Sequence, residues 1–147
     1  MRFAFLSALG CLLVSTAVGS SQDRADPLPQ EALVGEWVNA TKEGPRVFTR
    51  FVVAKKGDAR SIEAWFNAGG DKEVPMGKVP LSLLGDNAQA KSLPYGFATW
   101  DDKTSTQTIH MTLRLENGEV VAETFTIVKD KEKSGSNSHT QEKFKKK

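Results

Sequence analysis

Cysteine is almost absent from this 147-residue chain, whose single example is Cys11. Cys11 lies inside an apolar segment at the N-terminus, so the rest of the sequence contains no thiol. A chain without thiols beyond that segment can form no disulfide and no cysteine-based metal site or nucleophile there. The domain must therefore be held together by its hydrophobic core, and a chain of this length can bury enough apolar surface to do so.

An excess of charge of either sign is also lacking. Twenty basic and eighteen acidic residues give a formal net charge of +2, which does not indicate a nucleic-acid-binding surface. The one basic run, residues 143–147, is typical of a solubilising terminus. The two histidines, His110 and His139, stand apart and form no metal-ligand spacing. Acidic residues at 71–73 and 101–102 are interpreted as turn residues rather than calcium ligands. We therefore expect no metal, no cofactor, no catalytic set and no enzymatic activity.

Long hydrophobic runs are missing except at the N-terminus. Arg2 is followed by an apolar stretch over residues 3–18, which ends in the small residues Ala17-Val18-Gly19-Ser20. This pattern predicts a cleaved signal peptide over residues 1–20 and a secreted or periplasmic protein. The run is short for a membrane anchor, which needs about 20 apolar residues. Because it continues past Cys11, we do not expect that cysteine to be lipidated.

The remaining sequence divides into a short linker and one domain. Residues 21–31 are polar and contain two prolines, which predicts a linker. Residues 32–147 are long enough for a single domain. No window there shows a helical apolar stripe of ten or more residues. Strand-like alternation instead predicts eight strands, at residues 33–40, 47–54, 61–67, 74–84, 95–101, 106–115, 119–128 and 139–145.

The turns between these segments favour a meander. Asn117-Gly118 lies between the sixth and seventh strands and is a strong hairpin signal, because both residues tolerate positive φ. Pro80 makes the fourth strand an edge, a bulged strand or two short pieces. Eight short strands with tight turns predict an all-β fold, a small antiparallel up-and-down barrel. Such a barrel is just wide enough for side chains or one small ligand.

Inward and outward faces are clear in only part of the chain. In the sixth strand, Ile109, Met111, Leu113 and Leu115 share one face, and polar residues share the other. In the seventh strand both faces are partly apolar, which indicates a strand that lies under a neighbour or lines a cavity. The large candidates for the interior are Phe48, Phe51, Phe66, Met111, Leu113, Phe125 and Phe144. If all of them face inward, they could fill the barrel and leave no pocket.

Gly35-Glu36-Trp37 resembles the Gly-x-Trp of the first strand of lipocalin-type barrels, the calycins. In that family the indole lies across the closed end of the barrel. The stretches GEWVN, FTRFVV, EAWFN, MGKVPL and AETFTIVKDKEKSGSNSHTQEKF are together similar to a family of small secreted bacterial β-barrel domains of uncharacterised function. That family often has a cysteine pair between its third and fourth strands, and residues 66–72 here contain none. The resemblance implies a calycin-like fold and no particular activity.

A looser resemblance is to avidin-type biotin binders. Gly35, Trp37 and Asn39 match their Gly-x-Trp-x-Asn, and Gly96-Phe97…Trp100 matches a later strand. The resemblance implies that Asn39 would contact a ligand and that Trp100 would form a wall. The late tryptophan and the serine-bearing loop of that family have no counterpart here, so we do not expect biotin binding.

Arg50 lies in a strand that is otherwise strongly apolar. Alternation groups it with Phe48, Val52 and Ala54. If that face is inward, the guanidinium lies inside the barrel or at its mouth and needs a bound anion or an acidic partner, for which Glu36, Glu63 and Glu123 are candidates. The alternative is an Arg50 on the outer face or one that covers the Trp37 indole.

Two functions follow from this fold. The first is a secreted non-enzymatic barrel that binds a small, partly apolar ligand in its mouth, with Asn39, Arg50, Trp65, Tyr95 and Trp100 as candidate ligand-binding residues. Phe97 is a further aromatic residue that could line the mouth. The alternative is a filled barrel that acts through its outer surface as an envelope-associated or protein-interaction module. The sequence indicates neither an oligomeric state nor a protein partner.

Overall fold

The computed structural model describes residues 31–41, 47–67, 69, 72–85, 87, 89, 94–101, 105–129 and 135–147. The predicted signal peptide and all but one residue of the predicted linker lie outside these ranges. The strands are β1 (Gly35–Asn39), β2 (Phe48–Lys56), β3 (Ala59–Asn67), β4 (Glu73–Leu84), β5 (Tyr95–Trp100), β6 (Gln107–Glu116), β7 (Glu119–Val128) and β8 (Ser138–Lys146). Each of the eight predicted strands is present, with ends that differ by a few residues.

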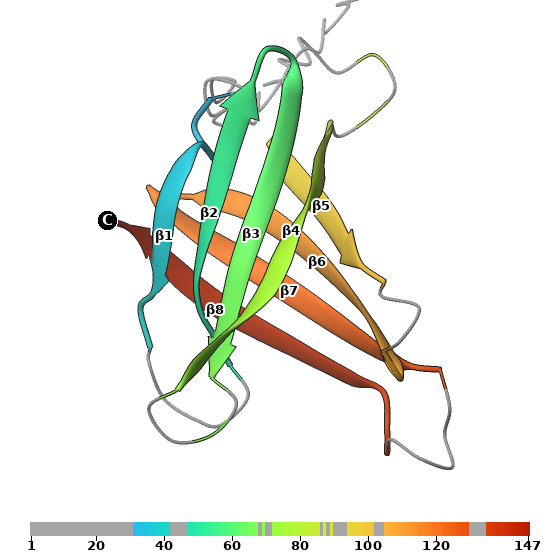
Figure 1. Ribbon diagram of the computed structural model, residues 1–147. Coiled ribbons are helices and arrows are strands. Elements are labelled where there is room, and N and C mark those ends of the chain that lie inside the picture. The colour runs from blue at the N-terminus through green and yellow to red at the C-terminus, as the bar shows by residue number, and fades with distance from the viewer. Residues whose placement is uncertain are drawn as a thin grey trace, which may run out of the picture.

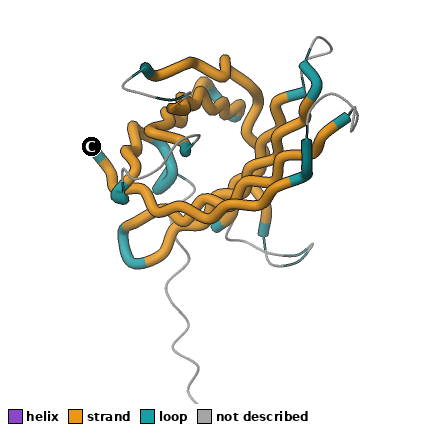
Figure 2. Tube along the Cα trace, turned by 90° about the horizontal axis from the view of Figure 1, so that it is seen from below, coloured by secondary structure: helices purple, strands orange, loops and turns teal. Residues whose placement is uncertain are grey.

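The eight strands form one closed antiparallel barrel. Each strand pairs with the next along the chain, and β8 returns to pair with β1 (Figure 1). The end-on view shows the strands arranged around a ring (Figure 2). The predicted all-β, eight-stranded up-and-down barrel is therefore confirmed. The described ranges contain no helix that is long and apolar enough to cross a membrane.

The β6–β7 hairpin forms at the predicted Asn-Gly turn. Asn117 and Gly118 have φ values of 51° and 82°. Positive φ at both positions gives the turn a twist that matches the flanking strands, and this fixes their register. Ten consecutive residue pairs follow, from Glu116↔Glu119 to Gln107↔Val128.

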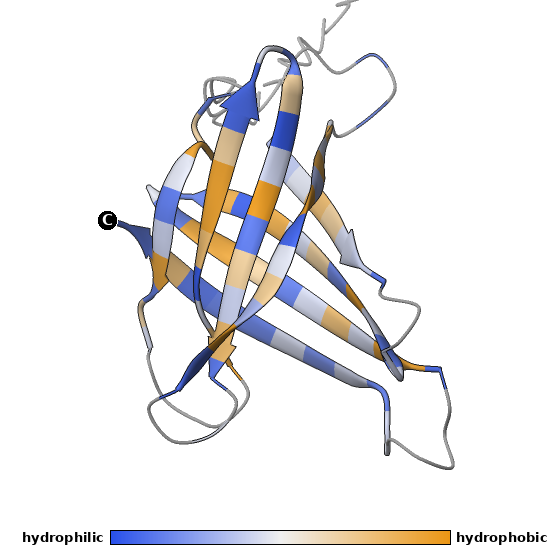
Figure 3. Cartoon of the chain, viewed as in Figure 1, coloured by the Kyte–Doolittle hydropathy of each residue, from blue (hydrophilic) through white to orange (hydrophobic). Residues whose placement is uncertain are grey.

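Hydrophobic and hydrophilic residues alternate along much of the strands (Figure 3). The buried hydrophobic residues form one core cluster inside the barrel. The predicted inward set of β6 is confirmed, with Met111 and Leu113 fully buried and Ile109 and Leu115 packed against the core. The largest fully buried side chains are Trp37, Phe51, Phe144, Ile62, Met111, Leu113, Val53 and Val120.

A β-bulge in β2 changes the expected face of one residue. The register shifts between Phe48 and Arg50, so Phe48 pairs with Phe66 and Arg50 pairs with Trp65. The extra residue lets Phe48 face inward together with Phe51, while Arg50 faces outward. The expected grouping of Arg50 with Phe48 is therefore wrong, because strict alternation does not hold across a bulge.

Strand β4 is irregular, as Pro80 predicted. Its register to β3 shifts opposite residues 63–65, near Gly77, whose φ is +82°. Pro80 is the last residue of β4 that pairs with β3, and Leu81 is the first that pairs with β5. The proline thus lies where pairing passes from one neighbour to the other, a position where its missing N–H interrupts neither ladder.

Trp37 closes one end of the barrel. Its indole is buried, donates a hydrogen bond from Nε1 to the Leu33 carbonyl at 2.8 Å, and stacks on Phe51 at 6.3 Å between ring centroids. The Lys146 ammonium lies 5.6 Å from the indole centroid. The cation beside Trp37 is therefore Lys146 and not Arg50. Trp37 is a plug for the interior, and this end of the barrel is filled.

Candidate functional site

The opposite end of the barrel holds a cavity of about 730 Å³. It lies where β2, β4, β6 and β8 begin, at the lower end of Figure 1. Its walls come from six strands and from the segment that precedes β8: Phe48, Phe66, Met76, Gln107, Ile109, Thr124, Thr126, Gly135, Ser136, Ser138 and Thr140. Cavities of this size accommodate drug-sized molecules.

One side of the cavity is apolar. Phe48 and Phe66 are paired across β2 and β3, and Met76 of β4 and Ile109 of β6 complete this wall. Trp100 packs against this wall, since its ring centroid lies 6.4 Å from that of Phe48. The Trp100 indole is fixed in turn by a 3.0 Å hydrogen bond from Nε1 to the Gly77 carbonyl.

The other side of the cavity is a stripe of hydroxyl groups on β7 and β8. Thr126 is paired with Ser138, and Thr124 is paired with Thr140. Inward positions recur every second residue, so these four side chains face the same interior. The Thr124 hydroxyl is buried and has no hydrogen-bond partner within the described part of the chain. A buried polar atom of this kind can receive a ligand group without losing an existing bond.

The hydroxyl stripe continues to a buried carboxyl group. Glu142 occupies the next inward position after Thr140 and is paired with Ala122. It is only 8% exposed, and neither of its carboxyl oxygens has a regular hydrogen-bond partner among the described residues. Burial raises the pKa of Glu142 to about 7, although the nearby Phe48 backbone N–H favours the ionised form. A carboxyl group with a raised pKa next to a cavity is a strong candidate for a functional group.

Asn39 faces inward but is engaged by the protein. Its side-chain amide donates a 2.7 Å hydrogen bond to the Phe48 carbonyl. Its carbonyl oxygen accepts hydrogen bonds from the backbone N–H and the hydroxyl of Thr41, at 2.8 and 2.7 Å. Asn39 does not contribute to the cavity wall, and its contacts hold the end of β1 against the start of β2.

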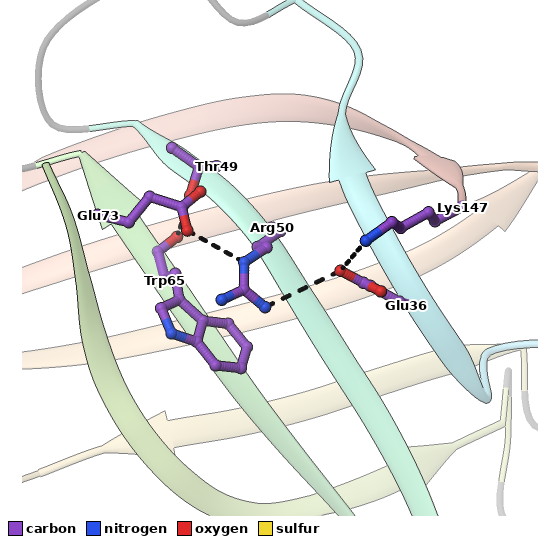
Figure 4. A network of polar contacts seen from close by, with 6 residues as sticks. All are labelled: Glu36, Thr49, Arg50, Trp65, Glu73 and Lys147. Atoms are coloured by element: carbon purple, nitrogen blue, oxygen red, sulfur yellow. Dashed lines mark hydrogen bonds and ion pairs between the residues drawn. The ribbon is translucent and has the colours of Figure 1, made fainter. Parts of the chain in front are cut away.

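Arg50 and Trp65 lie on the outer face of the barrel (Figure 4). The guanidinium carbon is 3.6 Å from the Trp65 ring centroid. Arg50 also pairs with Glu73 at 3.1 Å and with Glu36 at 3.9 Å, and Lys147 approaches Glu36 at 3.2 Å. Hydrogen bonds from Thr49 and Arg50 lower the pKa of Glu73. Of the two interpretations of Arg50, the outer-face position is confirmed, with Trp65 rather than Trp37 as the ring that it covers.

Tyr95 and Phe97 are also outside the barrel. Gly96 and Ala98 of β5 are buried, so the alternating residues Tyr95 and Phe97 face outward. Tyr95 borders a shallow outer hollow of about 260 Å³ beside Leu84 and Arg114. Trp65, Tyr95 and Phe97, which were expected at the mouth, are thus placed on the outer face and not among the residues that line the cavity. None of the five candidate binding residues lines the cavity, although Trp100 and Asn39 each contact Phe48 of its wall.

The main features of the site were not predicted from the sequence. Phe125 was expected inside, yet it is 37% exposed and stacks on His139 at 4.6 Å between centroids. In β7 the inward residues at the cavity are the threonines, and the outward ones are Phe125 and Ile127. The available signal was the run of polar residues at alternate positions of β7 and β8, which ends at Glu142.

The described residues contain no group of three or more His, Cys, Asp or Glu side chains that could hold a metal ion. No protein-family model matches the chain, and neither a curated protein nor a solved structure shows significant similarity to it.

Proposed function

We propose that this barrel binds a small amphipathic molecule in the cavity at its open end, as a secreted carrier or sensor. The observation that carries the proposal is the two-sided cavity of about 730 Å³, with an apolar wall on β2, β3, β4 and β6 and a hydroxyl stripe on β7 and β8. Apolar lining with a few convergent polar groups is the usual character of a ligand site. Secretion rests on the N-terminal apolar segment.

The packed side chains at the closed end limit how far a ligand can enter the barrel. Trp37, Phe51, Phe144 and Leu113 are fully buried, and they fill the interior toward the closed end. A ligand therefore occupies the mouth and the adjoining layer of side chains, and does not pass along the whole barrel axis. One end of the barrel is thus filled by side chains, and the cavity at the other end has room for a ligand.

Binding explains the described lining better than catalysis. The walls provide hydroxyl groups, one amide and apolar side chains, with the Glu142 carboxyl beyond them. The described lining includes no histidine or lysine that could activate a hydroxyl as a nucleophile. These groups can orient and hold a molecule through hydrogen bonds.

A cavity-filling variant tests the proposal. Thr126→Phe places a ring in the mouth, and Ile127→Phe is its matched control, because Ile127 is on the outer face of the same strand. The mature protein and both variants are screened by thermal shift against a small-molecule library. Compounds that stabilise the wild type and Ile127→Phe should not stabilise Thr126→Phe. Equal shifts in all three proteins would show that binding occurs elsewhere.

A second candidate function is favoured by one observation on the outer surface. Phe125 and Ile127 are exposed on adjacent outward positions of β7, with 37% and 41% of their surface accessible. Apolar residues gathered on an outer sheet face are typical of protein contacts. The double variant Phe125→Ser/Ile127→Ser should abolish any self-association seen by sedimentation, and unchanged sedimentation would remove this candidate.

A further inference from the structure

Two buried polar groups lie where the cavity lining meets the packed interior: Thr124 lines the cavity, and Glu142 lies in the layer just beyond the lining. The Glu142 carboxyl and the Thr124 hydroxyl are both more than nine-tenths buried, and neither has a regular hydrogen-bond partner among the described residues. The Phe48 backbone N–H is the one donor that approaches the Glu142 carboxyl closely enough to favour its ionised form. Ala122 pairs with Glu142, and Thr124 pairs with Thr140 two residues away, so the two polar groups are diagonal neighbours on one inner face. Because a single N–H can satisfy only part of the acceptor capacity of a carboxyl group, the two neighbouring groups can accept further hydrogen bonds.

We propose that the cavity selects ligands that carry an organic cation, such as an alkylammonium group, with Glu142 as the counter-ion and Thr124 as an additional acceptor. This inference rests on the proposed binding function and specifies its ligand class. An ammonium group donates up to three hydrogen bonds and needs only acceptors around it. A carboxylate and a hydroxyl supply both the charge and the acceptor, in a site where water is largely excluded.

The path into the barrel fits such a ligand. From the mouth inward, the hydroxyl groups of Ser138, Thr126, Thr140 and Thr124 form a polar line that ends at Glu142. The apolar wall opposite, with Phe48 and Phe66, covers the hydrocarbon part of the molecule. The ligand therefore enters with its charged end first and leaves its apolar part against the aromatic rings.

The opposite charge is disfavoured by the same residues. The inward side chains next to Glu142 on β1, β2 and β7 are Asn39, Phe48, Ala122 and Thr124, and none is charged. The described cavity lining likewise contains no lysine, arginine or histidine that could receive an anion. A carboxylate-bearing ligand would meet the Glu142 carboxyl with no compensating cation.

Cation binding must release a proton in part of the pH range. Burial raises the pKa of Glu142 to about 7, so at slightly acidic pH the group is mostly neutral before binding. A cation favours the ionised form, so the proton leaves Glu142 when the cation binds. The affinity for a cation should therefore rise with pH and level off above about pH 8, where Glu142 is already ionised.

Three probes of equal shape test the inference by titration calorimetry on the mature protein: 4-phenylbutylamine, 4-phenylbutanol and 4-phenylbutyrate. The amine should bind about tenfold more tightly than the alcohol, and the carboxylate most weakly, because a charge-assisted hydrogen bond is stronger than a neutral one. Glu142→Gln should remove the preference for the amine and leave alcohol binding in place. Glu123→Gln, an outward change on β7, is the matched control and should retain the preference.

A second measurement needs no variant. Near pH 6.5 the heat of amine binding should change with the ionisation enthalpy of the buffer, because a proton is released, whereas the heat of alcohol binding should not. If the alcohol binds and the amine has no advantage, the inference is overturned and the proposed binding function stands. If none of the three probes binds at millimolar concentration, the proposed function is overturned together with the inference.

Discussion

Thr140 and Glu142 occupy consecutive inward positions of β8, so a hydroxyl on the cavity wall leads directly to a buried carboxyl group. This relationship connects the open end of the barrel with its packed interior. The hydroxyl groups lead from the open cavity to a carboxyl group that has no regular hydrogen-bond partner among the described residues.

The stability of the protein should depend on the ionisation of Glu142. Its pKa is raised from 4.5 to about 7, so the folded state binds more protons than the unfolded state between those values. The free energy of unfolding should therefore fall as the pH rises from 4.5 to 7 and stay level above that range, by up to about 3 kcal/mol from this group. Glu142→Gln should remove this dependence and be more stable than the wild type at about pH 8. Urea denaturation at several pH values measures the free energy of unfolding, with Glu123→Gln as the control. If Glu142→Gln keeps the pH profile of the wild type, the pH dependence does not come from Glu142.

Arg50 should contribute modestly to stability and nothing to ligand binding. Its stacking on Trp65 and its ion pairs with Glu36 and Glu73 are on the outer face, where its side chain is 29% exposed. Arg50→Met should cost about 1 kcal/mol, since exposed cation–π contacts and surface ion pairs are weak. Probe affinity for the cavity should not change. A loss of affinity in Arg50→Met with the fold intact would place the ligand outside the barrel.

Asn39 should prove structural despite its match to the avidin-type pattern. Removing its side chain in Asn39→Ala leaves the Phe48 carbonyl and the Thr41 N–H without the partner they now have. We expect a loss of about 2 kcal/mol, because buried polar groups without partners are costly. Thermal denaturation measures the loss. A variant as stable as the wild type would show that these hydrogen bonds are replaced by water.

Trp37 should be needed for the closed end and not for the site. Trp37→Phe removes the hydrogen bond to the Leu33 carbonyl and leaves a void beside Phe51. Loss of stability of about 2 kcal/mol is expected from the lost volume and the lost bond. Calorimetry with the amine probe should give the wild-type affinity, since Trp37 is not among the residues that line the cavity. Weaker amine binding by a folded Trp37→Phe would mean that packing around Trp37 at the closed end affects the affinity of the cavity.

The barrel could be predicted from the sequence because its signals are local. Alternation in β6 and the Asn117-Gly118 turn depend on neighbouring residues, and both are found as predicted. The face of Arg50 could not be predicted, because a single bulge between Phe48 and Arg50 reverses the alternation. The residues that line the cavity could not be predicted from the sequence for a related reason. In β7, Phe125 faces solvent and Thr124 faces the interior, so hydropathy alone assigns both to the wrong side.

Native mass spectrometry can show whether the barrel carries a ligand, if the protein is purified from its own host and measured before and after mild organic extraction. We predict a discrete additional mass that is lost on extraction and is absent from Thr126→Phe. It should belong to a molecule with a basic nitrogen and an apolar part. The mass of the unmodified chain in every spectrum, together with no thermal shift by any compound of the library, would contradict this prediction.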